Sequence, residues 1–563
     1  MTRSVHIVDR MRWMAALGGA ALVAIAVAIA LGGTSGQLRT VVPGASSGSA
    51  GAGSSAPLDP RIATLAAHHP GTVVEAIVQF NGPVTQAKAQ SDATRVHGRL
   101  IGNLPIIHGL ALKLTAAEAR SLAASPDVHA VSLNTTVTPQ SLPYGHLPFP
   151  MTGLGVSGAQ LQTTYDQTLG VLPLWKVGVT GTGVGVAVVD TGVDGSLPDF
   201  ASTDHGSSRV VASAVANSDA TTATDSYGHG TDVAGIIAGN GDNRGPGDPL
   251  HGQYIGVAPN ANLISIKVSD ETGKASVLDV IYGLQFAVAH QSQFNIRVIN
   301  LSLDSTTPQS YKTDPLDAAV EAAWMNGIVV VAAAGNRGTA SDAVQYSPAN
   351  DPYVITVGGV DENGSATPSG DTIASWSSHG TTQDGIQKPD VYAPGAHIVS
   401  TLAPNSEFAN SCSTCIVGNG QYIQTSGTSM AAPVISGLVA DLLQIHPNWT
   451  PDQVKGDLTS PSVTENSSFQ EPNAVKAALL WSPAAADQGL TPNTLVNAAT
   501  GNIDYNLSTW SLSSWSRAKG PLRAGFALSS WSCDSCSATS VPGAASTLGS
   551  WSLGSWSTVQ PLG

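Results

Sequence analysis

Residues 183–190, GVGVAVVD, form an apolar run that ends in an acidic residue, Asp190. Four similar runs follow, separated by helical patterns such as VLDVIYGLQFAVAH (277–290). Near-continuous apolar strands that alternate with helices are typical of a parallel sheet covered on both faces. The sequence therefore predicts an α/β domain with a mostly parallel sheet between layers of helices. The other predicted strands are NLISIKV (262–268), RVINLSL (297–303), GIVVVAAAG (327–335) and PYVITVGGV (352–360).

A smaller pattern precedes this domain, within residues 59–140. The strand-like run TVVEAIVQF (72–80) is followed by a helical stretch, two strand-like runs, a second helix and a last strand-like run, VHAVSLN. Thr115 and Glu118 form a capping-box pattern at the start of the second helix. The order βαββαβ predicts a small split βαβ domain of the α+β class.

Both ends of the chain differ in composition from these domains. Three arginines precede an uncharged run, 13–33, which is typical of an export signal over residues 1–33. The run is also long enough to span a bilayer, so a cleaved signal peptide and a retained anchor both stay open. A Gly/Ser/Ala-rich flexible linker is predicted over 34–58 and a connector over 141–165. Residues 483–563 contain repeated Trp-Ser pairs, which predict either a low-complexity tail or a small β-rich appendage that binds a surface or substrate.

Charge and cysteine usage narrow the class of protein. The formal net charge is -15, so the basic surface that sequence-independent nucleic-acid binding needs is missing. The only cysteines form two Cys-x-x-Cys pairs, Cys412/Cys415 and Cys533/Cys536. Oxidised pairs are the default outside the cell. Two local loops, a tie between the main domain and the tail, and a four-thiolate zinc site are the open alternatives.

Four polar residues stand at the ends of predicted elements, next to glycines. Asp190 ends a buried strand, His229 lies in DSYGHGTDVAG, Asn336 follows AAAG, and Ser429 begins the apolar helix SGTSMAAPVISGLVADLL. Each position alone has an ordinary structural explanation, such as a helix N-cap for the serine. Together they supply the nucleophile, its base, an acid that orients the base, and an oxyanion donor, the set that acyl transfer requires.

The chain resembles the subtilases, the subtilisin-like serine proteases, over most of residues 166–482. The likeness rests on VAVVDTGVD, GHGTDVAG, GVAP, INLSL, AAAGN, PDVYAPG and GTSMAAP, which stand in family order. It implies a subtilisin-like three-layer fold and an exported serine endopeptidase that forms an acyl-enzyme with its substrate. The implied catalytic triad is Asp190, His229 and Ser429, with Asn336 as oxyanion donor. The implied substrate-binding residues, along which an extended peptide would pair, are Ser302, Leu303, Asp304, Ala333, Ala334 and Gly335.

Three features depart from the family pattern. Asp232 replaces a second histidine, which leaves a metal site with His229 as an alternative. Asp304 replaces a glycine beside the substrate groove, where a carboxylate would favour basic or small side chains unless Arg337 counters it. The insertion EFANSCSTCIVGNGQ (407–421) precedes the nucleophile motif, as a rim, a lid or a disulfide-pinned surface loop.

The resemblance also implies partners and ions. Residues 59–140 resemble the subtilase propeptide, an intramolecular inhibitor and folding aid, with cleavage expected between about 135 and 175. No cofactor is expected for catalysis, and a structural calcium ion is expected at Asp199. The protein is expected to be secreted, or to be anchored in the membrane with the bulk of the chain outside the cell. The rival hypotheses are a catalytically idle surface-binding protein that kept the fold and a membrane-anchored processing protease of narrow specificity.

Overall fold

The computed structural model describes residues 56–82, 84–139, 163–203, 205–466, 468–493 and the strand 530–533. The predicted export signal, nearly all of the linker, the connector up to residue 162 and most of the Trp-Ser-rich extension lie outside these residues. The larger domain, which was predicted to begin at residue 166, begins at helix α5 (Thr164–Leu169). Its folded part continues beyond the predicted end at 482, because Asn493 is fully buried and its backbone N–H donates to Glu321.

A nine-stranded sheet forms the middle of the larger domain. Its order is β14-β13-β12-β10-β6-β8-β7-β21, and β17 also pairs with β13. The pairings are parallel except those of β14 and β21. All five predicted strands are present, whereas β7, β14 and β17 were not predicted. The strands are β6 (Gly185–Asp190), β7 (Val210–Val215), β8 (Asn262–Lys267), β10 (Ile296–Leu301), β12 (Val329–Ala333), β13 (Ile355–Asp361), β14 (Thr372–Ile373), β17 (Val391–Pro394) and β21 (Ser530–Cys533).

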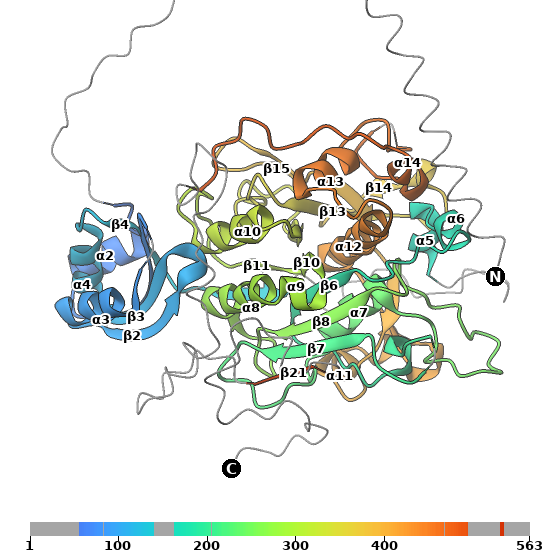
Figure 1. Cartoon of the computed structure of the whole chain (residues 1–563), viewed down its shortest axis with the longest axis horizontal. Helices are drawn as coiled ribbons and strands as arrows, with labels where there is room; N and C mark the ends of the chain where they lie inside the picture. The colour runs from blue at the N-terminus through green and yellow to red at the C-terminus, as the bar shows by residue number, and fades with distance from the viewer. Residues whose placement is uncertain are drawn as a thin grey trace, which may run out of the picture. The chain divides into compact units, whose positions relative to one another are not determined.

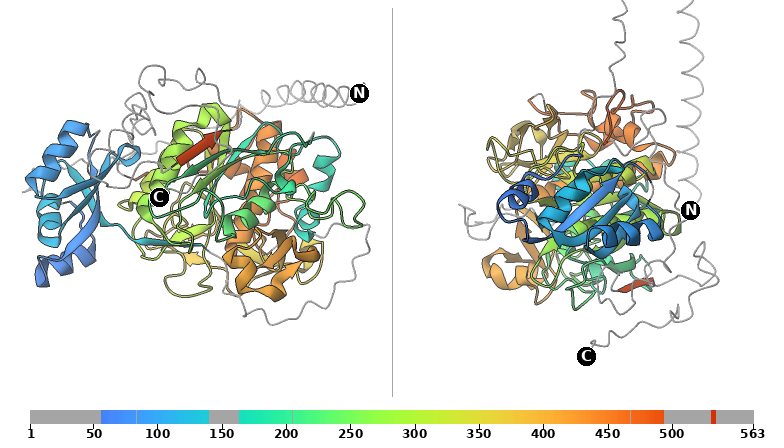
Figure 2. Two further views of the ribbon diagram at one scale, coloured as in Figure 1. Left: turned by 90° about the horizontal axis from the view of Figure 1, so that it is seen from below. Right: turned by 90° about the vertical axis from the view of Figure 1, so that its left-hand side faces the viewer.

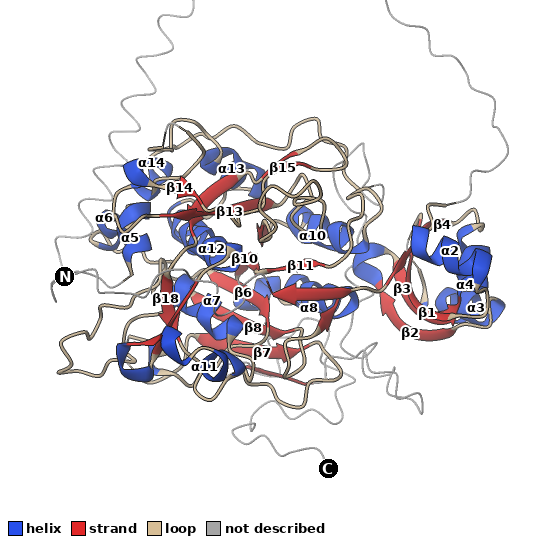
Figure 3. Ribbon diagram, turned by 180° about the vertical axis from the view of Figure 1, so that it is seen from behind, coloured by secondary structure: helices blue, strands red, loops and turns tan. Residues whose placement is uncertain are grey.

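Helices cover both faces of this sheet and complete the predicted three layers (Figure 1, Figure 3). Helices α7 (His229–Ala238) and α12 (Thr428–Ile445) pack against each other on one face. Helices α8 (Val277–Ala289) and α10 (Pro315–Met325) pack against each other on the opposite face. Among the described residues, α12 is the one helix with the length and mean hydropathy (1.4) of a membrane span, and 89% of it is buried inside the protein.

The smaller domain has the predicted βαββαβ order, with an additional first helix. Its antiparallel sheet has the order β2-β3-β1-β4, and the helices lie on one face (Figure 2). The capping box of Thr115 and Glu118 forms as predicted. On the other face, Ile77, Ile107 and Ala111 join the core of the larger domain. The elements are α2 (Pro60–His68), β1 (Val73–Phe80), α3 (Gln86–Arg95), β2 (Arg99–Leu104), β3 (Gly109–Thr115), α4 (Ala116–Ala123) and β4 (Val128–Leu133).

A short strand after the smaller domain leaves its sheet and joins the larger domain. Strand β5 (Thr136–Pro139) lies between β11 (Leu303–Ser305) and β9 (Ala275–Ser276), antiparallel to both. Its residues therefore occupy the edge along which the sequence predicted an extended substrate to pair.

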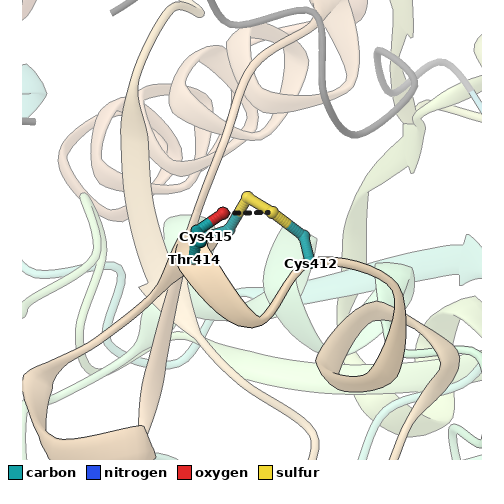
Figure 4. The surroundings of a disulfide bond; sticks show 3 residues. All are labelled: Cys412, Thr414 and Cys415. Carbon is teal, nitrogen blue, oxygen red and sulfur yellow. Dashed lines mark hydrogen bonds between the residues drawn. A yellow bond between two sulfur atoms is a disulfide. The ribbon is translucent and has the colours of Figure 1, made fainter. Parts of the chain in front are cut away.

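The insertion at 407–421 is a compact loop closed by a disulfide bond between Cys412 and Cys415 (Figure 4). This pair is therefore a local tie, and its sulfurs are not ligands of a four-thiolate zinc site. The loop holds α11 (Glu407–Ser411) and β19 (Ile416–Val417), which extends the pair β18 (Ile398–Thr401) and β20 (Tyr422–Thr425). The remaining elements are α6 (Leu172–Trp175), α9 (Gln291–Phe294), β15 (Gly380–Thr381), β16 (Gln387–Lys388), α13 (Pro451–Leu458), α14 (Ala474–Ala478) and 3₁₀ turns at 105–107, 198–200, 368–370, 413–415 and 418–420.

Candidate active site

Asp190 and His229 meet where the end of β6 faces the start of α7. The Nδ1 atom of His229 lies 2.7 Å from Oδ1 of Asp190, and both side chains are almost fully buried. The close approach depends on Gly230, because a Cβ atom there would lie 2.1 Å from the carbonyl oxygen of Gly192. The predicted pair of acid and base is thus brought together in hydrogen-bonding geometry.

The surroundings of His229 favour its protonated form without consuming its second nitrogen. Burial by itself lowers the pKa of His229, but the charge and hydrogen bond of Asp190 outweigh it and raise that pKa above its usual value. Asp232 and Asp225 add smaller charge effects in the same direction. Within the described part of the chain, Nε2 of His229 has no hydrogen-bond partner. This nitrogen is the one that a neighbouring hydroxyl would use as proton acceptor.

Ser429 lies in the first turn of α12, the helix that packs on α7. Its Oγ donates to the carbonyl oxygen of Ser302 at 2.9 Å, and Oγ of Ser302 donates to the carbonyl oxygen of Ser429 at 2.9 Å. The hydroxyl is therefore turned toward the start of β11 and not toward His229. The predicted acid and base are joined directly, and the predicted nucleophile is joined to the substrate-side strand.

Asn336 is anchored on the residue that precedes Ser429. Its Oδ1 accepts hydrogen bonds from the backbone N–H of Thr428 at 2.9 Å and from Oγ1 of Thr428 at 3.1 Å. The same hydroxyl is 3.1 Å from the backbone N–H of Gly335. Because the carbonyl end of the amide faces Thr428, the amino end points the other way, as an oxyanion donor requires. Thr428 was not predicted, although it lies within GTSMAAP.

Two of the predicted substrate-binding residues, Leu303 and Asp304, line one side of β5, whereas the other side is formed by β9, which was not predicted to bind substrate. Leu303 pairs with Pro139 and Asp304 with Thr138, while Ala275 on the other side pairs with Val137. Ala333, Ala334 and Gly335 lie at the end of β12, next to Asn336. A pocket in front of the acid is lined by Val137, Thr138, Pro139, Asp190, Thr191, Val268, Ser269, Gly273, Ala275 and Leu303.

Asp304 is paired with Arg337, so of the two possibilities left open by the sequence the structure has the one in which its charge is countered. It is 1% exposed and accepts a hydrogen bond from Nη1 of Arg337. The guanidinium of Arg337 in turn lies 3.7 Å from the ring centroid of Tyr346. Arg337 therefore counters the charge of Asp304, as the sequence suggested it could, and Tyr346 is a further contact that the sequence did not indicate.

Asp225 is a third residue of the site that was not predicted, after Thr428 and Tyr346. Its carboxylate accepts hydrogen bonds from the N–H groups of Gly228 and Thr231 and from the hydroxyls of Thr191 and Thr231, at 2.7–2.8 Å. These contacts tie the first turn of α7 to the end of β6. The signal for it was its place at the start of DSYGHGT, four residues before His229.

Asp232 is buried behind His229 and is bound to Thr425, not to a shared ligand with His229. The Thr425 hydroxyl donates to Oδ2 of Asp232 at 2.9 Å. Burial raises the pKa of this carboxyl to about 7. No group of three or more His, Cys, Asp or Glu side chains in the described part of the chain has metal-binding geometry, so the alternative of a metal at His229 and Asp232 gains no support.

The predicted calcium ligand Asp199 is held by protein donors. Oδ2 accepts from Oγ1 of Thr401 at 2.6 Å, and Oδ1 accepts from the Tyr422 hydroxyl at 3.0 Å and from the backbone N–H of Asn243 at 2.9 Å. Both oxygens are in use, so this conformation does not fit a calcium ion unless these donors rearrange. The calcium site stays a prediction.

The insertion loop packs against His229, on the side where α7 begins. Backbone N–H groups of Glu407 and Phe408 donate to Ser226 and Tyr227, in the segment that leads to α7. The fully buried ring of Phe408 meets the His229 ring edge-on at 5.7 Å. The loop is thus part of the wall behind the site and not merely a surface loop.

Comparison with known proteins agrees with this geometry. A model of the subtilase family matches residues 181–471, just over half of the 563 residues. The chain belongs to the subtilase family. This subtilase is 40% identical to serine protease AprX of Bacillus subtilis strain 168 over 282 residues, which cover 49% of this chain but only 60% of AprX. It is 36% identical to subtilisin of Bacillus pumilus over 298 residues, 53% of this chain and 90% of that protein.

A solved structure supports the fold of this subtilase. Fervidolysin from Fervidobacterium pennivorans, a keratinolytic enzyme related to subtilisin, superposes with a TM-score of 0.54 at 26% identity. The match covers 73% of this chain and 61% of fervidolysin. The prediction of a subtilisin-like three-layer fold is confirmed.

Proposed function

We propose that the protein is an exported serine endopeptidase that hydrolyses peptide bonds through Asp190, His229 and Ser429 and is made as a self-processing proenzyme. The observation that carries this proposal is the 2.7 Å contact of Asp190 with His229, which leaves Nε2 without a partner beside the helix that bears Ser429. The protease names of the relatives and the family match support the same reaction class.

The reaction begins when the Ser429 hydroxyl turns from the Ser302 carbonyl to Nε2 of His229, a rotation about one side-chain bond. His229 takes the hydroxyl proton as Oγ bonds to the substrate carbonyl carbon, and Asp190 stabilises the resulting imidazolium. Asn336 donates to the oxyanion. His229 then gives the proton to the leaving amine, and water repeats the sequence to release the acid.

Extended substrate segments bind between β11 and β9 by main-chain pairing, which favours unfolded or loop segments of proteins. The position of β5 between these strands supports this mode of binding, because β5 is an extended segment in antiparallel register with both. The smaller domain then acts as a propeptide whose last strand blocks the groove until it is removed. Export rests on the N-terminal sequence pattern.

The register of β5 indicates which bond the proenzyme cuts. Leu303 pairs with Pro139, the last residue of β5. A substrate residue one step further along the same antiparallel register would pair with Ser302. The carbonyl oxygen of Ser302 accepts the Ser429 hydroxyl. The residue that pairs with Ser302 would therefore present its carbonyl carbon to Ser429. Because Gln140 follows Pro139 in the sequence, we expect cleavage between Gln140 and Ser141.

Intact-mass analysis of the full chain beside Ser429→Ala tests this proposal. The wild type should lose everything up to residue 140 and react with a fluorophosphonate probe, whereas Ser429→Ala should keep the smaller domain and remain unlabelled. Equal masses without labelling of the wild type would contradict the proposal and favour the idle surface-binding protein. A cut at another bond would overturn the register argument alone.

A further inference from the structure

An ion pair lies on the side of the groove that receives the substrate side chain before the cut. Asp304 is the second residue of β11, and Arg337 directly follows Asn336. Gly335 lies against both members of the pair, since a Cβ atom there would lie 3.0 Å from Nη1 of Arg337 and 3.2 Å from Oδ2 of Asp304. The pair and the glycine therefore form one continuous wall next to the oxyanion donor.

The strand register places this wall beside the residue that precedes the scissile bond. Asp304 is directly opposite Thr138. In antiparallel strands, opposed residues and the residues two positions away share a face of the sheet and lie within reach of long side chains. A substrate residue that pairs with Ser302 comes two positions after the one opposite Asp304, so its side chain lies on the same face as Asp304.

Of the two charges, only that of Arg337 is accessible. Asp304 is 1% exposed and is neutralised by its partner. The Arg337 side chain is 26% exposed. Its guanidinium is held in place by a cation–π contact with the Tyr346 ring and by the ion pair with Asp304. Its backbone N–H donates to Oγ of Ser378 at 2.9 Å, which fixes the main chain as well.

We propose that Arg337, held by Asp304 and Tyr346, selects peptides whose residue before the cut carries a carboxylate or carboxamide, and disfavours lysine or arginine there. A guanidinium offers several N–H donors in a planar fork that matches these acceptors. The sequence of the chain itself is consistent, because the residue before its own expected cut is Gln140. This inference rests on the proposed function and adds the substrate class to it.

Four peptide p-nitroanilides test the inference, identical except for Glu, Gln, Ala or Lys before the leaving group. We expect the processed wild-type protein to show kcat/KM at least about 10-fold higher for Glu and Gln than for Lys, the size of a charge-assisted hydrogen bond. Arg337→Gln removes the accessible charge and leaves that of Asp304, so the ratio of Glu to Lys should fall by about 10-fold or more. Arg337→Lys keeps the charge but loses the fork and the ring stacking, and should retain part of the preference. Lys176→Ala, which removes an exposed cation at the end of α6, is the matched control.

An enzyme that cleaves all four substrates with a ratio that neither substitution at 337 changes would overturn the inference and leave the proposed function intact. A fall of the ratio in Lys176→Ala equal to that in Arg337→Gln would also overturn it. A wild type that hydrolyses none of the four, like Ser429→Ala, would contradict the proposed function first.

Discussion

The two halves of the active site are prepared to different degrees. The half around His229 is in place: Asp190 fixes the ring at 2.7 Å, Asp225 ties down the first turn of α7, and both carboxylates are buried. In the half around Ser429, the hydroxyl is bonded to the strand that receives substrate. The difference teaches that the fold alone fixes His229 against Asp190, whereas Ser429, as the proposed nucleophile, must exchange the Ser302 carbonyl for His229 before it can react.

The largest effect on catalysis is expected from substituting the central residue of either half, Ser429 or His229. Ser429→Ala and His229→Ala should each lower kcat by about 10⁶-fold, and the double variant should be no worse than either single one, because the residues act as a unit. Peptide hydrolysis measures kcat, and thermal unfolding checks that the variants fold. Losses that multiply in the double variant would show that the halves act separately.

The next largest effect sharpens the role of the anchor beside Ser429. Asn336→Ala should lower kcat by about 10²–10³-fold with little change in KM, because the donor acts on the developing oxyanion. Thr428→Val removes the hydroxyl that orients Asn336 but keeps the backbone bond, so a loss of about 10-fold is expected. Thr428→Ser, which retains a hydroxyl, should lose less than Thr428→Val. Equal losses of kcat in the two Thr428 variants would show that the Thr428 hydroxyl does not orient Asn336.

A smaller effect concerns the charges behind the base. His229 must be neutral to accept a proton, and its raised pKa means that activity falls, as pH decreases, at a higher pH than an ordinary histidine would give. Asp232→Asn removes one cause of that raised pKa and retains an acceptor for Thr425, so the acidic limb of kcat/KM should move to lower pH. We expect the maximal rate to change by less than about 10-fold. Glu465→Gln, which removes a carboxylate at an exposed site, is the control. If Asp232→Asn left the acidic limb of the kcat/KM profile at the same pH, the charge effect of Asp232 on His229 would be contradicted.

The smallest effect is expected from calcium. Because Thr401, Tyr422 and Asn243 already donate to Asp199, calcium should raise Tm by no more than about 1 °C relative to a chelator, which corresponds to less than about 1 kcal/mol. Calorimetry of wild type and Asp199→Asn measures the shift. A large calcium-dependent rise in Tm that Asp199→Asn abolishes would show that the calcium ion displaces the protein donors from Asp199.

The sequence predicted the larger sheet through its apolar runs, but not every strand of it. Strand β7 was missed although VVASAV is as apolar as the predicted strands NLISIKV and RVINLSL, and β17 was missed because VYAP is short and ends in proline. The five strands that were predicted carry runs of three to nine consecutive apolar or small residues, the pattern that burial on both faces favours.

The residues of the candidate site could be predicted where a short sequence motif indicates their chemical role. Asp190 and His229 fall in that class, and their contact followed from the strand-end rule. The bond of Ser429 to Ser302 and the stacking of Arg337 on Tyr346 join residues from distant segments, and their geometry depends on side-chain rotamers that no local pattern specifies. The pairing of Asp304 with Arg337 was suggested by their places beside the predicted groove, but the sequence did not show that the carboxylate is fully buried.

The ring of Phe408 gives the disulfide loop a consequence for proton transfer. A benzyl group against the imidazole edge keeps water from the rear of the base, so Asp190 acts on it through a medium of low dielectric constant, where electrostatic attraction is stronger than in solvent. The two sulfurs that close the loop thereby help to set the basicity of a residue that they never touch.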